Sequence, residues 1–339
     1  MRRLAILVAL VLVFAACGED TPETVRLLTH DFFAVSDELL DAFSVETGFE
    51  VQIVRGGDAA IVVNQSILTA GNPVADVIFG VDTTLISRAI GADLFDPYRS
   101  PQLDFVPAEL HVALDVATPI DLGDVCLNYD KELLADPPSA LRELASPAYA
   151  GLLVVPDPTI SSPGLAFLLA TIDEFGETGD YTWRDFWSDL RANDVEIVGD
   201  WGTAYYGSFS GSDGGDRPIV VSYASSPPAE VLFSDPPIER ATTGVIEAGC
   251  FRQVEYAGVL RGADNPVGAR TLIDFMLSEA FQQAVPTSMF VFPVRSGTIL
   301  PEVFVSNTRI PVEPAIIEPD LIDHNRERWL AEWIETVLR

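Results

Sequence analysis

Residues 24–54 read TVRLLTHDFFAVSDELLDAFSVETGFEVQIV, and this stretch decides the fold class. It opens with a short run of strand-forming residues at 24–28. Ser36 can then cap a helix, and Gly48 can end it. Residues 49–54 are again strong strand formers. Strand, helix and strand in this order predict an α/β fold with a mostly parallel sheet and helices on both faces.

The same alternation continues along the chain. Further strands are expected at 75–79, 124–128, 152–155, 195–198, 219–223 and 250–260. Further helices are expected at 59–70, 85–90, 165–175, 183–192, 266–277, 279–284 and 326–338. The last of these helices carries Trp329, Leu330, Trp333, Ile334 and Val337 on one stripe, which is typical of a helix facing a core.

The composition excludes several classes of protein. The chain has 339 residues, with 51 acidic and 20 basic side chains and a formal charge of -31. Because 48% of the residues are hydrophobic, the chain is too apolar to be disordered. It is too acidic to coat nucleic acid or to be held by charge on an anionic membrane, so we expect no nucleic-acid partner. Its length suits two domains.

The N-terminus predicts the location of the protein. Arg2 and Arg3 precede a short apolar run at 4–14, which is typical of a secretory signal peptide over residues 1–16. Residues 14–17 read FAAC and resemble a bacterial lipobox, so Cys17 is expected to carry lipid. Residues 17–24 would form a lipidated tether, and the protein would be anchored on the extracytoplasmic face of the cell membrane. The alternative is an ordinary signal peptide followed by an incidental cysteine.

Two cysteines remain in the body of the chain. Cys126 and Cys250 form an even pair in a compartment that is expected to be oxidising, which predicts a disulfide between them. The alternative is two buried free thiols.

Motifs for catalysis are poorly represented. The histidines are His30, His111 and His324, so no HExxH zinc motif exists. The chain also lacks a GxSxG elbow, a P-loop and a GxGxxG fingerprint. We therefore expect a protein that is not an enzyme and that carries no cofactor and no catalytic metal.

Short polar segments that carry aromatic residues stand where strands end and helices begin. They are residues 28–33, 56–59, 157–164, 200–206 and 222–227. In open α/β sheets, ligands bind beyond the carboxyl ends of strands. Two sets of such segments facing each other would form a cleft lined by Asp, Ser, Trp and Tyr.

These segments, together with others along the chain, resemble a known family. The matching stretches are 29–33, 75–82, 128–131, 137–144, 157–165, 201–205, 222–227, 253–255, 275–294 and 328–333. Their order and spacing are similar to those of the thiamine-binding proteins of bacterial ABC importers, within the type II periplasmic-binding fold.

This resemblance implies two lobes that close over a ligand about a β hinge. Hinge strands are expected near 124–128 and 251–257, which also brings Cys126 and Cys250 close together. Lobe 1 would comprise residues 25–124 plus 258–339, and lobe 2 residues 125–257 with the hinge strands. The implied partners are a small ligand, thiamine or its phosphates, and an ABC permease in the membrane. The protein itself is expected to be a monomer.

The ligand site follows from the same resemblance, residue by residue. Ala59 stands where the family has glycine, Phe290 where it has tryptophan, His30 where it has tyrosine, and Ala229 replaces a further tyrosine. The expected ligand residues are His30, Asp31, Asp58, Ala59, Ser161, Ser162, Trp201, Tyr205, Tyr223 and Phe290. The flat rings of thiamine would stack on the aromatic side chains, and Asp58 would offset the positive thiazolium.

Other interpretations remain open. Trp201 and Tyr223 could be packing residues, and Asp58 a simple helix cap. Tyr205 and Tyr206 resemble the tandem tyrosines that hold ferric ion in related periplasmic proteins, and a polyamine or another organic cation would also suit an acidic cleft. A lipoprotein with a structural or adhesive role belongs to a different class altogether.

Overall fold

The computed structural model describes residues 23–111, 116–212 and 214–339. The predicted signal peptide at 1–16 and Cys17 lie outside this range, as does most of the predicted tether. Among the helices of the described residues, none is both long and apolar enough to cross a membrane.

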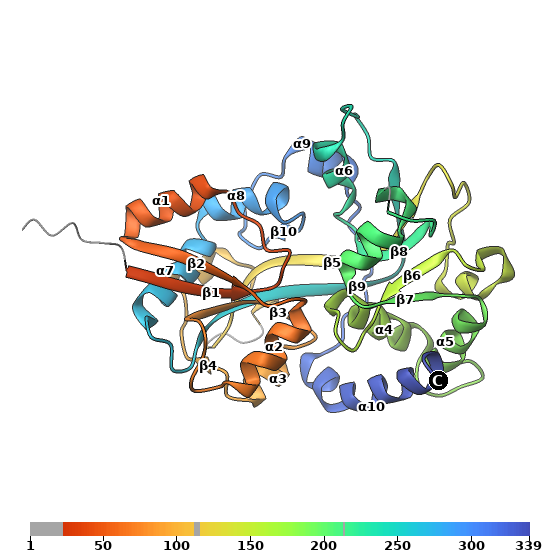
Figure 1. Cartoon of the computed structure of the whole chain (residues 1–339), viewed down its shortest axis with the longest axis horizontal. Helices are drawn as coiled ribbons and strands as arrows, with labels where there is room; N and C mark the ends of the chain where they lie inside the picture. The colour runs from red at the N-terminus through yellow and green to blue at the C-terminus, as the bar shows by residue number, and fades with distance from the viewer. Residues whose placement is uncertain (1–22, 112–115, 213) are drawn as a thin grey trace, which may run out of the picture.

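One ten-stranded sheet runs through the molecule (Figure 1). Its main path is β2 (Phe49–Arg55), β1 (Glu23–Thr29), β3 (Val77–Asp82), β9 (Thr243–Leu260), β5 (Thr118–Asp130), β8 (Ile219–Tyr223), β6 (Leu153–Pro156) and β7 (Glu196–Val198). Two short strands lie off this path, where β4 (Phe95–Asp96) pairs with β9 and β10 (Phe292–Pro293) pairs with β5.

Parallel pairing is confined to the two ends of the sheet. β1 pairs in parallel with β2 and β3 at one end, and β6 with β7 and β8 at the other. The long central strands β5 and β9 are antiparallel to each other and to their outer neighbours. The predicted α/β class is confirmed, but the sheet is continuous and mixed because two long strands connect its parallel ends.

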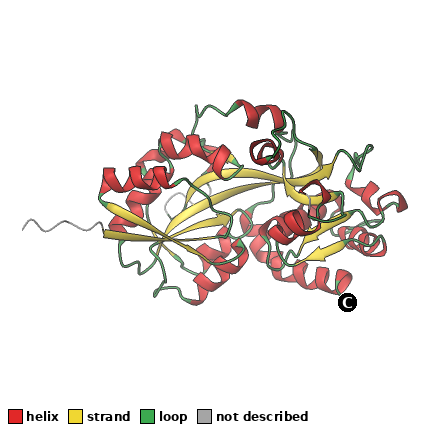
Figure 2. Cartoon of the chain, turned by 45° about the horizontal axis from the view of Figure 1, so that its top comes forward, coloured by secondary structure: helices red, strands yellow, loops and turns green. Residues whose placement is uncertain are grey.

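Helices cover the sheet on both sides (Figure 2). The α-helices are α1 (Asp37–Thr47), α2 (Ala59–Leu68), α3 (Ile86–Gly91), α4 (Ser162–Phe175), α5 (Trp183–Ala192), α6 (Pro227–Phe233), α7 (Pro266–Met276), α8 (Glu279–Ser288), α9 (Glu302–Asn307) and α10 (Pro319–Val337). Short 3₁₀ turns are η1 (Pro101–Phe105), η2 (Ala108–Leu110), η3 (Leu141–Ala145), η4 (Pro147–Tyr149) and η6 (Ser210–Ser212), and η5 (Thr203–Ser208) is a π-helix.

The helix ends that the sequence predicts for α1 are confirmed. The side chain of Ser36 accepts a hydrogen bond from the backbone N–H of Leu39, and Gly48 adopts the left-handed conformation with φ 75°.

Each end of the sheet has its own hydrophobic core. Around β1 and β3, side chains such as Phe79 pack beneath the flanking helices. Around β6 and β8, the core contains Phe167 of α4 and Trp187 of α5. β5 contributes to both cores, with Ile120 in the first and Val125 in the second. The central strands therefore connect two separately packed bodies.

The last helix, α10, packs its predicted apolar stripe into the second core. Trp333 is fully buried and meets Trp187 edge to face, with ring centroids 5.6 Å apart. The start of α10 also reaches the first body, where the hydroxyl of Ser87 on α3 donates to Asp320 at 2.9 Å. The predicted lobe boundaries, which group this helix with residues 25–124, stay a prediction.

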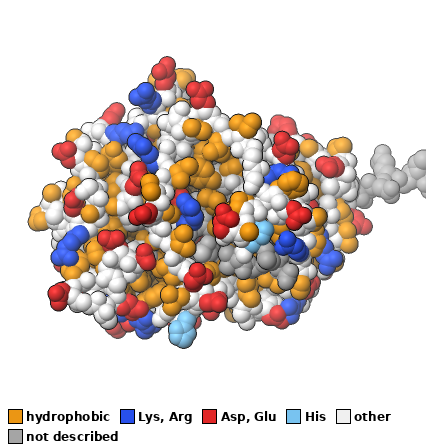
Figure 3. All heavy atoms as spheres, turned by 180° about the vertical axis from the view of Figure 1, so that it is seen from behind, with side chains coloured by type: hydrophobic (Ala, Val, Ile, Leu, Met, Phe, Trp, Pro, Cys, Tyr) orange, Lys and Arg blue, Asp and Glu red, His pale blue; other side chains and the backbone are white. Residues whose placement is uncertain are grey.

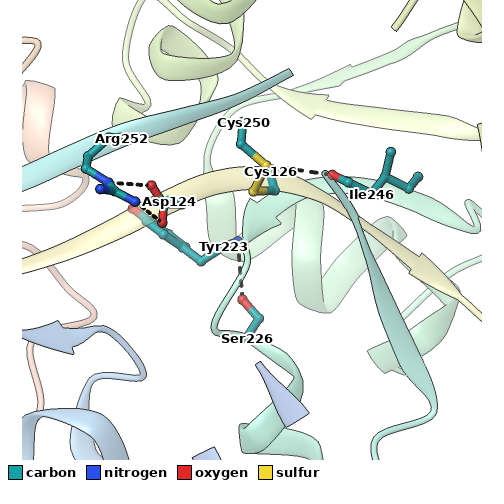
Figure 4. The surroundings of a disulfide bond; sticks show 7 residues. All are labelled: Asp124, Cys126, Tyr223, Ser226, Ile246, Cys250 and Arg252. Atoms are coloured by element: carbon teal, nitrogen blue, oxygen red, sulfur yellow. Dashed lines mark hydrogen bonds and ion pairs between the residues drawn. A yellow bond between two sulfur atoms is a disulfide. The ribbon is translucent and has the colours of Figure 1, made fainter. Parts of the chain in front are cut away.

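Cys126 and Cys250 form the predicted disulfide between β5 and β9 (Figure 4). Their Cα atoms lie 4.3 Å apart, and both residues are buried. The β5–β9 ladder shifts register at this point, since Val125 pairs with Phe251 whereas Leu127 pairs with Ile246. The covalent bond therefore joins the two strands where their backbone pairing is interrupted.

We expect the double variant Cys126→Ala, Cys250→Ala to lose about 2–5 kcal/mol of the free energy of unfolding. The bond joins residues 124 positions apart, so its loss frees a long loop in the unfolded chain. Urea unfolding followed by tryptophan fluorescence measures the effect, and reduced wild-type protein should behave like the double variant. An unchanged unfolding midpoint in both samples would contradict the expectation.

Candidate functional site

A cavity of about 470 Å³ lies where strands of both bodies end and helices begin. Every predicted ligand residue except Ser161 lines it. These residues are His30, Asp31, Asp58, Ala59, Ser162, Trp201, Tyr205, Tyr223 and Phe290. Segments that lie far apart in the sequence therefore meet around one space of a size that suits a small organic molecule.

Ser161 does not line this cavity. It is fully buried and stands directly before α4, but its hydroxyl makes no capping bond to that helix. Its neighbour Ser162 begins the helix and does line the cavity. A contact between Ser161 and a ligand therefore finds no support in this conformation.

Asp58 connects the two bodies at the edge of the cavity. It precedes α2, yet its side chain makes no capping bond to that helix. Instead, one carboxylate oxygen accepts the backbone N–H of Ser162 at 3.1 Å, so that Asp58 serves the N-terminus of α4. Burial raises the pKa of Asp58, and the bond from Ser162 lowers it in part. The simple cap of its own helix, considered from sequence, is not what the structure shows.

The turn from β6 into α4 depends on Gly164. A Cβ atom at this position would lie 2.2 Å from the carbonyl oxygen of Pro156 at the end of β6. Only glycine allows the helix to start so close to the strand. This close approach places Ser162 and Pro163 at the cavity wall.

Aromatic side chains form one wall of the cavity. Trp201 stacks on Tyr205 with ring centroids 5.1 Å apart and planes inclined by 24°. The edge of Phe32, from the other body, meets Trp201 at 4.7 Å. The indole N–H of Trp201 donates to the hydroxyl of Ser222 at 3.1 Å, which fixes the orientation of the ring. Tyr205 belongs to the π-helix η5, a form that is common at functional sites.

A second aromatic pair faces the cavity from α6 and the chain after α8. Phe290 and Phe233 meet with ring centroids 5.7 Å apart. Phe290 has φ 56°, a conformation that is unfavourable for a bulky side chain. Local strain at a residue of the cavity wall is consistent with a role for its ring in ligand contact.

The floor of the cavity contains His30 and Glu255. His30 Nε2 lies 3.5 Å from a carboxylate oxygen of Glu255. Gly80 makes room for the imidazole, since a Cβ there would lie 2.5 Å from His30 Cδ2, and its φ of 91° also favours glycine. Burial lowers the pKa of His30 to about 4, so the ring is neutral at pH 7.

Several further residues line the cavity but were not among the expected ligand residues, although some of them lie in the segments that were expected to form the cleft. They are Phe32, Phe33, Ala34, Arg55, Pro163, Tyr206, Ser226, Ala229, Phe233, Glu255, Ser288, Met289 and Val291. Phe32 and Tyr206 adjoin predicted residues, and their aromatic character was a usable signal. Glu255 lies within a long β-rich run and ends the family-like stretch 253–255, but nothing in the sequence indicated that its carboxylate faces the ligand.

The charge around the cavity is mostly negative. Asp31, Asp58 and Glu255 line it, and among the described lining residues Arg55 is the single arginine or lysine. One guanidinium nitrogen of Arg55 donates to the carbonyl of Phe33 at 3.1 Å. On the face in Figure 3, by contrast, acidic and basic side chains are interspersed over the surface. The cavity therefore suits a ligand that combines positive charge with flat rings.

The tandem tyrosines are poorly prepared to bind a metal ion. The hydroxyl of Tyr205 donates to Glu230 at 3.2 Å, and burial raises its pKa well above the usual range, which disfavours the phenolate. Tyr206 is largely exposed. Within residues 23–111, 116–212 and 214–339, no three His, Cys, Asp or Glu side chains are grouped as metal ligands.

Two known proteins to which this chain is similar are both named as thiamine-binding periplasmic proteins. A thiamine-binding periplasmic protein of Brucella suis biovar 1 (strain 1330) is 28% identical over 325 residues, which cover 94% of this chain and 93% of that protein. The thiamine-binding periplasmic protein of Escherichia coli (strain K12) is 29% identical over 315 residues, covering 92% of each chain.

Solved structures agree in fold. A periplasmic thiamin binding protein superposes with a TM-score of 0.83 at 26% identity, covering 93% of this chain and 96% of the other. Iron-bound HitA from Pseudomonas aeruginosa shares the fold with a TM-score of 0.76 at 20% identity, covering 93% and 99%. Residues 72–318 match the family described as bacterial extracellular solute-binding protein. The chain therefore belongs to the bacterial extracellular solute-binding proteins.

Proposed function

We propose that this protein captures thiamine, or a closely related cationic ring compound, and delivers it to an ABC permease. The observation that carries the proposal is the cavity itself, which joins aromatic walls to carboxylates. Trp201 and Tyr205 offer stacked faces, while Asp58 and Glu255 supply carboxyl groups. A cation over an aromatic face gains about 0.5–2 kcal/mol, and burial strengthens the attraction.

The relatives support the choice of ligand. The proteins from Brucella suis and Escherichia coli are named for thiamine binding and cover most of this chain. Thiamine has a flat aminopyrimidine and a cationic thiazolium, so it uses both features of the cavity. We propose that the cavity lies between two lobes, which close on the ligand about the central strands β5 and β9. Asp58 and Ser162 would then be contacts made on closure.

Attachment to the membrane is part of the proposal. The lipobox-like residues 14–17 support cleavage after residue 16 and lipid on Cys17, with the body held as a monomer on the extracytoplasmic face. A protein tethered in this way remains close to the permease that it serves. In the proposed function the protein is not an enzyme, because it carries the ligand without covalent change.

Unphosphorylated thiamine should bind more tightly than thiamine pyrophosphate. The cavity has several carboxylates against one arginine, and Asp58 already occupies the N-terminus of α4, where a phosphate would otherwise find backbone N–H groups. Isothermal titration of the purified protein with thiamine, its mono- and pyrophosphate, spermidine and Fe³⁺ measures the order. No heat and no thermal shift with any thiamine compound would overturn the proposed ligand.

The variant Trp201→Ala should weaken thiamine binding by about 1–2 kcal/mol, which is roughly a 5- to 30-fold loss of affinity. It removes the central ring of the aromatic wall. Titration calorimetry gives the affinity and thermal unfolding shows that the protein remains folded. Phe105→Ala is the control, because Phe105 is half exposed and lies outside the cavity. Equal losses in both variants, or none in Trp201→Ala, would remove Trp201 from the site.

A further inference from the structure

Three carboxyl groups lie side by side on neighbouring strands beneath the cavity. Glu255 of β9 is directly opposite Asp121 of β5 and, on its other side, Asp82 of β3. Residues directly opposite each other in antiparallel strands project to the same face of the sheet. Asp82 and Asp121 are buried, whereas the side chain of Glu255 is 19% exposed and lines the cavity.

The outer two carboxylates differ in their hydrogen bonds. Asp82 accepts from the backbone N–H and the hydroxyl of Thr84 at 2.7 and 2.6 Å, and from the amide of Gln253 at 2.6 Å. Both oxygens of Asp121 are buried and have no hydrogen-bond donor among the described residues. A buried polar group without a donor is costly, and it is more costly when charged.

A nearby pair of residues on the same two strands has the basic partner that Asp121 lacks. Asp124 of β5 is also buried, and Arg252 of β9, directly opposite, donates to both of its oxygens at 2.8 and 3.0 Å (Figure 4). At the Asp121 position the opposite residue is another acid. Two adjacent carboxyl groups, of which Asp121 is buried and Glu255 is only partly exposed, cannot both ionise cheaply, so the pair retains a proton.

The groups around Glu255 do not supply a positive charge that would stabilise the ionised pair. The titratable and charged groups that face it are Asp121 on β5, Asp82 on β3, His30 after β1, Asp58 before α2, Tyr223 on β8 and Arg55 on the cavity wall. His30 is neutral at pH 7, and the described ion pairs join no arginine or lysine to Asp121 or Glu255. Burial raises the pKa of Asp121 to about 7, and burial together with the charge of Asp121 raises that of Glu255 well above its usual range.

We propose that Glu255, backed by Asp121, is the counter-ion of the bound cation, and that ligand entry displaces the proton which these two carboxyl groups share. This inference rests on the proposed function, because it assigns the partner of the positive charge within the same cavity. The exchange is balanced: the O–H bond of the carboxylic acid breaks, the proton leaves to solvent, and the cation takes its place beside the carboxylate. The charge in the cavity is the same before and after.

The proton exchange sets the pH dependence of binding. A cation beside Glu255 favours the ionised carboxylate, so the pKa of the pair is lower in the complex than in the free protein. Between these two pKa values binding releases a proton, and affinity rises with pH by up to about tenfold per unit. Above the pKa values of the free pair the affinity becomes constant. Thiamine affinity should therefore fall as the pH drops through the raised pKa values of the free pair.

The test is titration of the purified protein with thiamine at about pH 6.5 in two buffers of different ionisation enthalpy. The difference in heat gives the number of protons released, and we expect close to one for the wild type. Glu255→Gln should release none and should bind thiamine about 10- to 100-fold more weakly. It should also raise the melting temperature of the ligand-free protein at neutral pH, because the native state no longer has to hold an unpaired carboxyl group.

Two further variants sharpen the result. Glu247→Gln removes an exposed carboxylate from the same strand outside the cavity, and it should leave proton release, affinity and melting temperature as in the wild type. Asp121→Asn should reduce proton release near neutral pH, since burial still raises the pKa of Glu255 but the charge of Asp121 no longer adds to it.

Wild-type protein that binds thiamine without releasing a proton, or Glu255→Gln with wild-type affinity, would overturn this inference alone. Wild-type protein that gives no heat with thiamine would overturn the proposed function as well.

Discussion

The antiparallel pairing of β5 and β9 is the interaction on which the rest of the structure depends. Each strand contributes side chains to both hydrophobic cores, so the two bodies share a backbone connection and not only a surface. The disulfide between Cys126 and Cys250 joins the two strands covalently at the register shift between Val125 and Leu127. Without this pairing, the segments that line the cavity would have no fixed relation to one another, because they come from both bodies.

The same two strands also carry a pair of carboxyl groups, Asp121 and Glu255, that forms no ion pair with an arginine or lysine among the described residues. Backbone pairing places Asp121 opposite Glu255, so the two carboxyl groups project to the same face of the sheet. The pair of Asp124 and Arg252 is accommodated in the same sheet at little cost because each charge has its partner. A cation that enters the cavity would supply the positive charge that Asp121 and Glu255 do not receive from the protein. The charge of the ligand would then act directly on the two central strands, β5 and β9, that connect the two bodies.

Much of this arrangement could be predicted from the sequence, because it depends on local patterns. Ser36 and Gly48 mark the ends of α1, and the spacing of Trp329 and Trp333 identifies their buried face. Long-range pairing is harder to predict. The sequence pattern indicates that residues 250–260 form a strand, but it does not show that this strand continues back to Thr243 or runs antiparallel to β5. Those features depend on partners more than a hundred residues away.

Glu255 shows why a site residue can escape sequence analysis even when its surroundings do not. Aromatic residues next to glycine and serine are conspicuous, and Trp201 and Tyr223 could be placed at the cavity from their segments alone. A carboxylate is conspicuous only when its counter-charge is missing, which is a property of three-dimensional neighbours. In a chain with a formal charge of -31, most acids gain hydration or an arginine. The overall charge can favour the approach of a cation, but the place where it binds is decided by the few acids that have neither full hydration nor an arginine partner.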